Sequence, residues 1–345
     1  MTEVTYSNRR AVRIENEDLR VTVLFGGGHI AEIFHKKTGV NPLWTPPWPS
    51  IEPSTYDPAV HTAYGSDAES RTLSGIMGHN LCLDIFGPPS ETEAAAGINV
   101  HGEASVLPYD IQMVGDDLFC TVLLQAPMLL FQRHLRLEGS TLRISETVTN
   151  LTACDRAIAW TQHVTLGPPF LQNGKTQFRL PATRSKTSES DFSGPKGYMA
   201  IGAEFQWPNV PHKNGGTVDL RVYPSYEVSG GYTAQLMDPG KPEAYFMAWS
   251  PDSRLLFGYR WHREDFPWLG IWEENRSRTA PPWNGKTIAR GMEFGVSPFP
   301  ETRRQMIERG SLFGQRAYRW IPARTSVTAD YSAFARQADA IPETL

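Results

Sequence analysis

Cysteine is scarce in this sequence, and the few cysteines present are not spaced like metal ligands. The chain of 345 residues contains only Cys82, Cys120 and Cys154, an odd number without the short intervals that zinc sites use. We therefore expect free thiols that are mostly buried. Free thiols persist in a reducing compartment, so the sequence favours a cytoplasmic protein.

Long hydrophobic runs and basic stripes are also missing. The first residues, MTEVTYSNRR, lack the apolar core of a signal peptide, and no apolar run reaches the length that spans a membrane. Lysine and arginine total 33 against 37 aspartate and glutamate residues, a net charge of −4. Because no basic surface is indicated, we expect neither a membrane nor a nucleic acid as partner.

Several well-known catalytic motifs are absent. The sequence contains no GxSxG, no HExxH, no Walker loop and no GxGxxG that opens a helix. The triple glycine at residues 26–28 follows one predicted strand and precedes another, so a phosphate-binding helix N-terminus is not expected there. His29 and His35 are not expected to bind a metal together, and we predict neither a metal nor an organic cofactor.

The chain does contain a regular alternation of apolar and polar residues. Val12 and Ile14 alternate with polar residues, and Leu19, Val21 and Val23 repeat the pattern. A period of two predicts half-buried strands. Aromatic residues make up 11% of the chain, beside 27 prolines and 29 glycines, a mixture typical of many short strands joined by turns.

The strand patterns continue without a break in composition. Residues 105–150 contain four closely spaced strand patterns, which indicate a sandwich. Residues 45–70 and 182–200 are predicted loops, and only residues 302–309 and 331–338 look helical. Since neither a linker nor a repeat of fixed period is visible, we predict one all-β domain over residues 1–345, a large antiparallel β-sandwich with few short helices.

One carboxylate lies in the middle of a predicted strand. Residues 288–300 read IARGMEFGVSPFP, in which Gly291 and Gly295 bracket Glu293 among apolar and aromatic neighbours. Burying an unpaired carboxylate costs several kcal/mol, on the order of that for other unpaired polar groups. Glu293 is therefore either neutralised by a partner such as Arg290 or used in catalysis.

The order of these elements resembles the aldose 1-epimerase (galactose mutarotase-like) superfamily over roughly residues 11–335. The opening segment LRVTVLFGGGHIAEIFHKKTGVNPLW matches that family's strand, glycine turn, strand and turn. The further matches are short and follow the family's order: Arg71, His101-Gly102, the ETVTN of residues 146–150, Thr161-Gln162-His163 and Glu293.

The resemblance implies a fold and a reaction. The fold is a sandwich of very large sheets, the supersandwich, with a small-molecule carbohydrate on its concave side. The reaction is anomer interconversion, with Glu293 as base, His163 as acid, His101 as a hydrogen-bonding partner of the sugar and Arg71 as a clamp on its hydroxyls or a charged substituent. A carboxylate and an imidazole suit these proton transfers because their pKa values bracket neutral pH. No cofactor is implied, and a monomer or homodimer is expected.

Other residues compete for these roles. Glu273 and Glu274 are rivals of Glu293 for the base or for contacts with the substrate, and His79 is a rival of His101 for the upstream imidazole. Histidines at strand ends are also often purely structural, and so is an arginine in a loop.

The sequence also departs from the family. Gln162 stands where the family usually has asparagine, and the acidic segment that binds sugar hydroxyls has no match, with Asp238 near its place. These changes favour a divergent branch that acts on an unusual, modified or phosphorylated sugar, or one that has lost epimerisation. Tryptophans gather late in the chain, and Trp272 is our candidate for stacking on a sugar face.

Two other functions fit the same scaffold. A glycoside hydrolase or lyase would use two carboxylates, about 5–9.5 Å apart in a hydrolase, and Glu293 with Glu273 or Asp238 would supply them. A non-catalytic carbohydrate-binding protein would keep an aromatic cleft without the proton-transfer pair.

Overall fold

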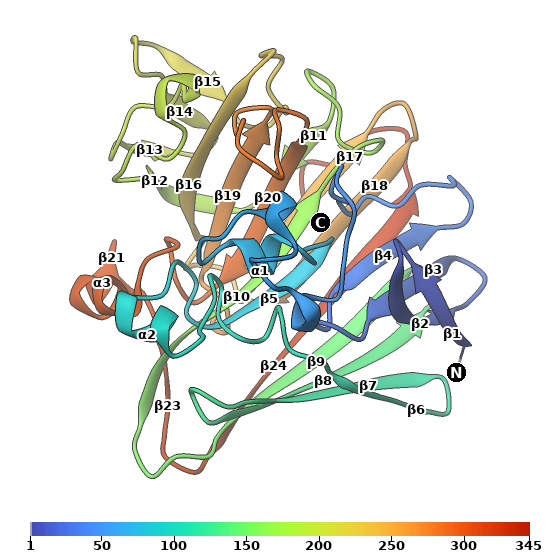
Figure 1. The fold of residues 1–345 in the computed structure, drawn as a ribbon. Helices are drawn as coiled ribbons and strands as arrows, with labels where there is room; N and C mark the ends of the chain where they lie inside the picture. Colours follow the sequence, from blue (N-terminus) through green and yellow to red (C-terminus); the bar gives the residue numbers. More distant parts are fainter. Residues whose placement is uncertain (1) are drawn as a thin grey trace.

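Two large antiparallel β-sheets dominate the computed structural model, which describes residues 2–345 (Figure 1). In spatial order the 12-stranded sheet contains β1 (Thr2–Tyr6), β2 (Arg9–Glu15), β3 (Leu19–Leu24), β4 (Ile30–His35), β5 (His79–Asp84), β10 (Arg156–Leu166), β20 (Ile288–Gly295), β19 (Trp268–Asn275), β16 (Ser229–Met237), β12 (Ala182–Thr187) and β13 (Glu204–Gln206), with β23 (Arg319–Ile321) paired to the start of β10. The eight-stranded sheet contains β11 (Gln177–Arg179), β17 (Glu243–Ser250), β18 (Leu255–His262), β24 (Ser326–Gln337), β9 (Thr141–Asn150), β8 (Leu129–Glu138), β7 (Asp117–Leu124) and β6 (Asp110–Val114). The all-β prediction is confirmed.

The remaining elements are short. Two hairpins pair β14 (Asn209–Pro211) with β15 (Thr217–Asp219) and β21 (Ser311–Leu312) with β22 (Gln315–Arg316). The helices are α1 (Ser70–Leu73), α2 (Glu91–Ala95) and α3 (Arg303–Arg309), with 3₁₀ turns at Pro53–Thr55, Thr62–Tyr64 and Gly194–Lys196. No helix within residues 2–345 is both long and apolar enough to cross a membrane.

The prediction of a helix at 302–309 is confirmed, but that at 331–338 is wrong. α3 starts with a capping box, in which Thr302 and Gln305 satisfy each other's backbone N–H groups. Residues 331–337 instead belong to β24, which pairs with β9 on one side and β18 on the other. The alanines there favour a helix locally, but Ala333 and Ala335 face the core at a period of two, so packing decides. Residues 182–187, predicted as loop, form the strand β12.

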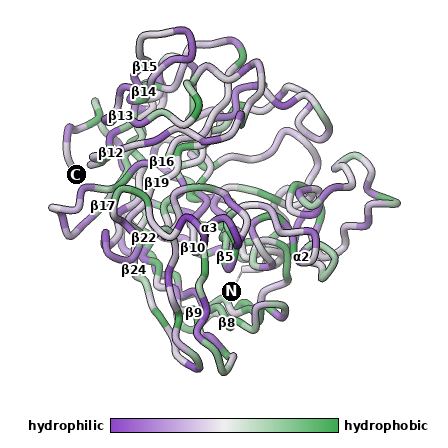
Figure 2. The backbone as a smooth tube through the Cα atoms, turned by 90° about the vertical axis from the view of Figure 1, so that its left-hand side faces the viewer, coloured by the Kyte–Doolittle hydropathy of each residue, from purple (hydrophilic) through white to green (hydrophobic). Residues whose placement is uncertain are grey.

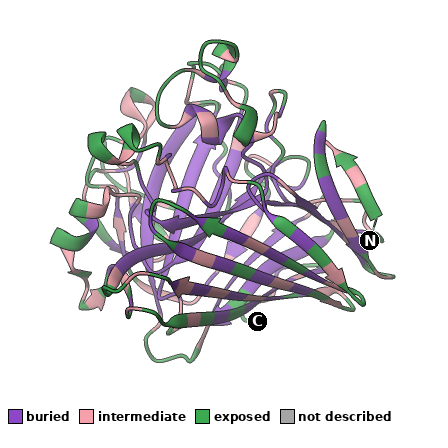
Figure 3. Ribbon diagram, turned by 60° about the horizontal axis from the view of Figure 1, so that its bottom comes forward, coloured by how far each residue is buried: buried purple, intermediate pink, exposed green. Residues whose placement is uncertain are grey.

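The two sheets differ in how their strands are buried (Figure 3). In β7 and β8, buried and exposed residues alternate, so one face of this part of the smaller sheet meets solvent. Hydropathy changes correspondingly along β8 and β9 (Figure 2). By contrast β5, β16 and β19 are buried at every residue, and β10 and β20 at all but the first. The centre of the large sheet is therefore covered on both faces.

One apolar core fills the space between the sheets, and a second cluster covers the outer face of the large sheet. The inner core includes Trp160, Phe131 and Phe257, each essentially without exposed surface. Burying each such side chain contributes about 1.5–3 kcal/mol. The outer cluster joins the large sheet to the segments between β4 and β5 and between β19 and β20, with Leu73 of α1 and Trp283 among its members. Figure 1 shows α1 in front of β5, β10 and β20.

The thiols are free, as predicted. Cys82 and Cys120 are buried and Cys154 is exposed.

Candidate active site

His163 and Glu293 meet because their strands are neighbours in the large sheet. β10 and β20 are antiparallel, and their register places His163 directly opposite Glu293. Residues directly opposite each other in such a pair project from the same face. Nε2 of His163 lies 3.1 Å from Oε1 of Glu293, and both side chains are almost completely buried. Two groups far apart in sequence thus form one pair.

The strand glycines make room for this pair. A Cβ atom on Gly291 would lie 2.2 Å from Oε1 of Glu293. Gly270 of β19 lies opposite Glu293, and a Cβ atom there would lie 2.0 Å from the hydroxyl oxygen of Tyr232. Glycine therefore leaves space beside the carboxyl group that any other residue would fill.

His101 completes the polar floor from a loop. Its backbone has a positive φ of 70°, a conformation that non-glycine residues adopt only where their surroundings require it. Its Nδ1 lies 2.6 Å from the carbonyl oxygen of Phe86, so Nδ1 carries the proton and donates it. Nε2 is then the free acceptor. The ring centroids of His101 and His163 are 5.1 Å apart.

These three polar side chains open into a cavity of about 240 Å³. Drug-sized ligands occupy pockets of about 300–1,000 Å³, so this cavity suits a smaller molecule. Apolar and aromatic groups form most of its walls, while the polar groups lie at its floor and mouth. The lining residues are Glu69, Leu73, Ile76, Phe86, Gly87, Pro88, Val100, His101, His163, Phe192, Tyr232, Trp272, Arg278, Trp283, Glu293 and Pro300.

Burial decides the protonation of the floor. It raises the pKa of the Glu293 carboxyl group well above its ordinary value, and Arg278 opposes this shift only in part. It lowers the pKa of His163 well below its ordinary value, and the neighbouring His101 adds to the shift. Burial also lowers the pKa of His101, although the Phe86 carbonyl partly offsets it. Both shifts favour the uncharged forms, so burial favours a carboxylic acid at Glu293 beside a neutral imidazole at His163.

Such a pair can release a proton from one atom and accept a proton at another atom about 3 Å away. Oε1 of Glu293 is buried without a hydrogen-bond partner among residues 2–345. The contact to His163 is close but poorly aligned, which leaves this oxygen available to a ligand. No group of three or more His, Cys, Asp or Glu residues in the described chain is placed to hold a metal ion.

Trp272 lines the cavity, whereas five other candidates lie outside it. Arg71 points away from the cavity and donates from Nε to the carbonyl oxygen of Pro53. His79 is fully buried on the opposite face of the large sheet, where its ring nitrogens contact Gln162 and Tyr259. Asp238 follows the end of β16, in a turn where it accepts from the backbone of Gly240.

Glu273 lies outside because of strand parity. It neighbours Trp272, so it projects toward the opposite face of β19. There it accepts hydrogen bonds from Tyr198 and Ser229 and lies 3.7 Å from Arg290. Arg290 is thus the partner of Glu273 rather than of Glu293. Glu274, the other rival of Glu293, accepts hydrogen bonds from Ser277 and from the backbone of Arg278, and it does not line the cavity.

Sequence reasoning missed several residues of the cavity. Tyr232 lies opposite Trp272, a neighbour that appears only once β16 is paired with β19. Glu69 and Arg278 come from loops more than 200 residues apart, and their side chains form an ion pair of 2.9 Å. No local pattern marks either loop residue, although residues 45–70 were predicted as a loop.

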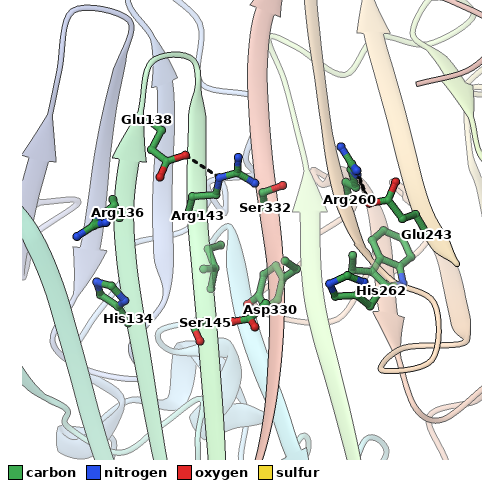
Figure 4. A pocket seen from close by; sticks show the side chains of 13 residues that line it. His134, Arg136, Glu138, Arg143, Ser145, Glu243, Arg260, His262, Asp330 and Ser332 are labelled. Carbon is green, nitrogen blue, oxygen red and sulfur yellow. Dashed lines mark hydrogen bonds and ion pairs between the residues drawn. The ribbon is translucent and has the colours of Figure 1, made fainter.

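A larger hollow exists on the solvent face of the eight-stranded sheet (Figure 4), but it is a poor candidate for the active site. Its volume is about 490 Å³, and it is an open trough. Its charged groups pair with each other across neighbouring strands, as Arg143 does with Glu138 and Arg260 with Glu243. Exposed ion pairs of this kind contribute little, at most about 1 kcal/mol each. No buried titratable pair comparable to Glu293–His163 opens into it.

Comparison with known proteins places the fold. No model of a protein family matches the sequence, and no curated protein is significantly similar to it. The structure is similar to a proposed aldose 1-epimerase from Klebsiella pneumoniae, with 14% identity, a TM-score of 0.65 and 96% of this chain and 80% of the other covered. It is also similar to a galactose mutarotase-like protein from Clostridium acetobutylicum, with 12% identity, a TM-score of 0.64 and coverage of 97% and 98%. A third similar structure is Slr1438 from Synechocystis sp. PCC 6803, with 15% identity, a TM-score of 0.62 and coverage of 98% and 100%.

Proposed function

Because the chain has the galactose mutarotase-like fold, we propose that it is an aldose 1-epimerase-like enzyme that interconverts the anomers of a sugar. The observation that carries this proposal is the Glu293–His163 pair, 3.1 Å apart and buried at the floor of a cavity of about 240 Å³. The fold alone does not carry it, because one fold hosts many functions.

The chemistry needs two proton transfers. One group takes the proton of the anomeric hydroxyl while another protonates the ring oxygen, so the ring opens. Rotation about C1–C2 and closure on the other face of the carbonyl then give the second anomer. Since burial favours the neutral pair, Glu293 starts as the carboxylic acid that protonates the ring oxygen, and His163 accepts the hydroxyl proton.

Ring closure exchanges these two roles. His163 then donates and Glu293 accepts, so the pair returns to its starting state without a cofactor. The resemblance in sequence implied Glu293 as the first base, and the buried pair favours the reverse order. His101 accepts a hydrogen bond from a sugar hydroxyl at Nε2, because its Nδ1 proton is engaged with the Phe86 carbonyl.

The proposal is tested by anomer exchange in a panel of aldoses, measured by saturation-transfer NMR. We expect catalysed exchange of at least one sugar and a loss of about 10²–10⁴-fold in His163→Ala, the usual contribution of a positioned acid or base. His262→Ala, the same substitution at an exposed residue of the trough, is the matched control and keeps the wild-type rate. Exchange in the wild-type protein no faster than in His163→Ala, for every sugar, would disprove the proposal.

The dependence of the rate on pH should be bell-shaped. On the acidic side the rate rises as His163 loses its proton, with a midpoint below its ordinary pKa of 6.5, because its pKa is lowered. On the alkaline side the rate falls as Glu293 loses its proton, with a midpoint well above its ordinary pKa of 4.5. Measuring kcat/KM between pH 4 and 10 gives both midpoints. Because the two groups interact, the midpoints are apparent pKa values of the pair rather than of either residue alone. A rate that keeps rising through the alkaline range would contradict a starting state with a carboxylic acid at Glu293 and a neutral imidazole at His163.

Neither carboxylate that was expected to act with Glu293 in a hydrolase lines the cavity. Glu273 projects from the opposite face of the sheet, and Asp238 lies outside the cavity. Release of reducing ends from glycosides would nevertheless favour that alternative, and binding of a sugar without anomer exchange would favour a carbohydrate-binding protein.

A further inference from the structure

The cavity offers few hydrogen-bonding partners above its floor. Most of its lining is aromatic or aliphatic, and the hydroxyl group of Tyr232 already donates to the carbonyl oxygen of Pro298 at 3.1 Å. Besides Glu293, His163 and His101, the ionisable side chains at the charged end of the lining are Glu69 and Arg278. A ligand therefore meets two sets of polar side chains, one at the buried floor and one at Glu69 and Arg278, together with the apolar rest of the lining, which we call the apolar belt.

Glu69 and Arg278 hold each other, and Arg278 has further contacts of its own. Nη1 of Arg278 donates to Oε1 of Glu69 at 2.9 Å, and the two side chains are about one-third exposed, at 31% and 33%. The guanidinium group lies over Trp283, 4.7 Å from its ring centroid. The backbone N–H of Arg278 donates to Oε1 of Glu274 at 3.1 Å, which fixes its loop to the end of β19.

This geometry leaves one acceptor and one donor side by side. Oε2 of Glu69 has no hydrogen bond among the described residues, nor has Nη2 of Arg278. A carboxylate oxygen beside a guanidinium nitrogen matches two neighbouring hydroxyl groups, one donating and one accepting. The pair is already neutralised within itself, so it does not call for a charged substituent.

We propose that Glu69 and Arg278 form the hydroxyl clamp of this cavity and that the ligand is a deoxyhexose, whose hydroxyl-poor part lies against the apolar belt. This inference rests on the proposed function for its orientation, with the reducing end at Glu293 and His163. Each additional hydroxyl placed against the belt loses hydrogen bonds to water without replacement. An apolar pocket discriminates against an added hydroxyl by at most about 100-fold.

Matched sugars that differ at a single hydroxyl test the ligand class. The pairs are D-fucose with D-galactose, L-rhamnose with L-mannose, and 2-deoxy-D-glucose with D-glucose. We expect kcat/KM for anomer exchange to be at least tenfold higher for the deoxy member of at least one pair. Equal or higher values for the hydroxylated member of every pair overturn the inference.

Two substitutions test the clamp. Glu69→Gln and Arg278→Met should raise KM for the preferred sugar at least tenfold. Glu69→Gln should change kcat less than threefold, because the clamp binds the ligand away from the reacting atoms. Arg304→Met, which removes an exposed ion pair with Glu308 on α3, should leave KM unchanged. Melting temperatures within a few degrees of wild type identify folded variants, and the conservative Glu69→Gln remains informative if Arg278→Met does not fold. An unchanged KM in folded Glu69→Gln overturns the clamp.

Binding to Glu293→Gln separates this inference from the proposed function. Ligand-observed NMR titrations with the same sugar pairs measure affinity without turnover. Tighter binding of a deoxy member, combined with no anomer exchange by the wild-type protein, supports the ligand class and disproves the enzyme. If the wild-type protein catalyses anomer exchange equally fast for both sugars of every pair, the enzyme is supported and the ligand class is overturned.

Discussion

Glu293→Gln should lower the rate of anomer exchange by about 10²–10⁴-fold while leaving the fold intact. Glutamine has nearly the same shape, so the space left by Gly291 and Gly270 still accommodates it. It neither releases nor accepts the proton that the ring oxygen exchanges, so His163 is left without its partner. The measurement is saturation-transfer NMR on the best substrate of the wild-type protein, with Glu138→Gln on the exposed face of the smaller sheet as matched control.

The same substitution should stabilise the protein at neutral and alkaline pH. The pKa of the Glu293 carboxyl group is raised by folding, so its contribution to stability is complete below pH 4.5 and is lost as the pH rises through the folded-state pKa. Glutamine does not titrate, and its advantage therefore grows above pH 4.5. We expect a gain of about 0.5–2 kcal/mol at pH 8, the usual size for a stabilising substitution, and none at pH 4.

Urea denaturation at the two pH values measures this difference. A stability gain accompanied by loss of activity is the pattern of a residue kept for function at a cost to the fold. A variant that is less stable than wild type at pH 8 would instead mean that the carboxylate is held by compensating interactions. Glu293 would then be a structural residue, and the proposed proton transfer would lose its donor.

Much of the architecture could be predicted because period-two patterns are local. The alternating segments of the first strands, the strand around Glu293 and the helix at 302–309 each depend on neighbouring residues only. The helix prediction at 331–338 was wrong because the alanines there carry a local helix preference, which the pairing of β24 with both β9 and β18 overrides.

The site could be predicted only in part, because it depends on pairing. Glu293 was found as a lone carboxylate in an apolar strand and His163 through the family resemblance, and the register places them opposite each other. Glu273 was a plausible rival in sequence, yet its parity on β19 sends it to the other face. Arg278 and Glu69 carry no local signal, since their proximity depends on how two distant loops cover the sheet.

A buried ion pair on the core side of β10 should dominate the stability of this region. Nε of Arg133 donates to Oε1 of Glu146 at 2.7 Å, and neither side chain is exposed by more than 1%. Glu146 also accepts from Tyr331, Trp160 and the side-chain amide of Gln162. Glu146→Leu would leave the Arg133 charge buried without compensation, so we expect a loss of about 3–5 kcal/mol in the free energy of unfolding.

The double variant Arg133→Met/Glu146→Leu should recover much of that loss. Removing both charges also removes the desolvation cost, and apolar replacements for buried ion pairs are often neutral or stabilising. Urea denaturation of wild type, both single variants and the double variant gives the coupling between the two residues. A loss below about 1 kcal/mol in Glu146→Leu would show that the charge of Arg133 is solvated in some other way.

This network also bears on the active site through the geometry of β10. Gln162 and His163 are consecutive, so they project from opposite faces of the strand. A slip of one residue would send His163 into the core and Gln162 into the cavity. The hydrogen bonds that Gln162 donates to Glu146 and accepts from His79 exist in one register only, and they hold His163 opposite Glu293. Gln162→Leu should therefore reduce anomer exchange more than its effect on the folded fraction explains, although the side chain lies on the face away from the sugar.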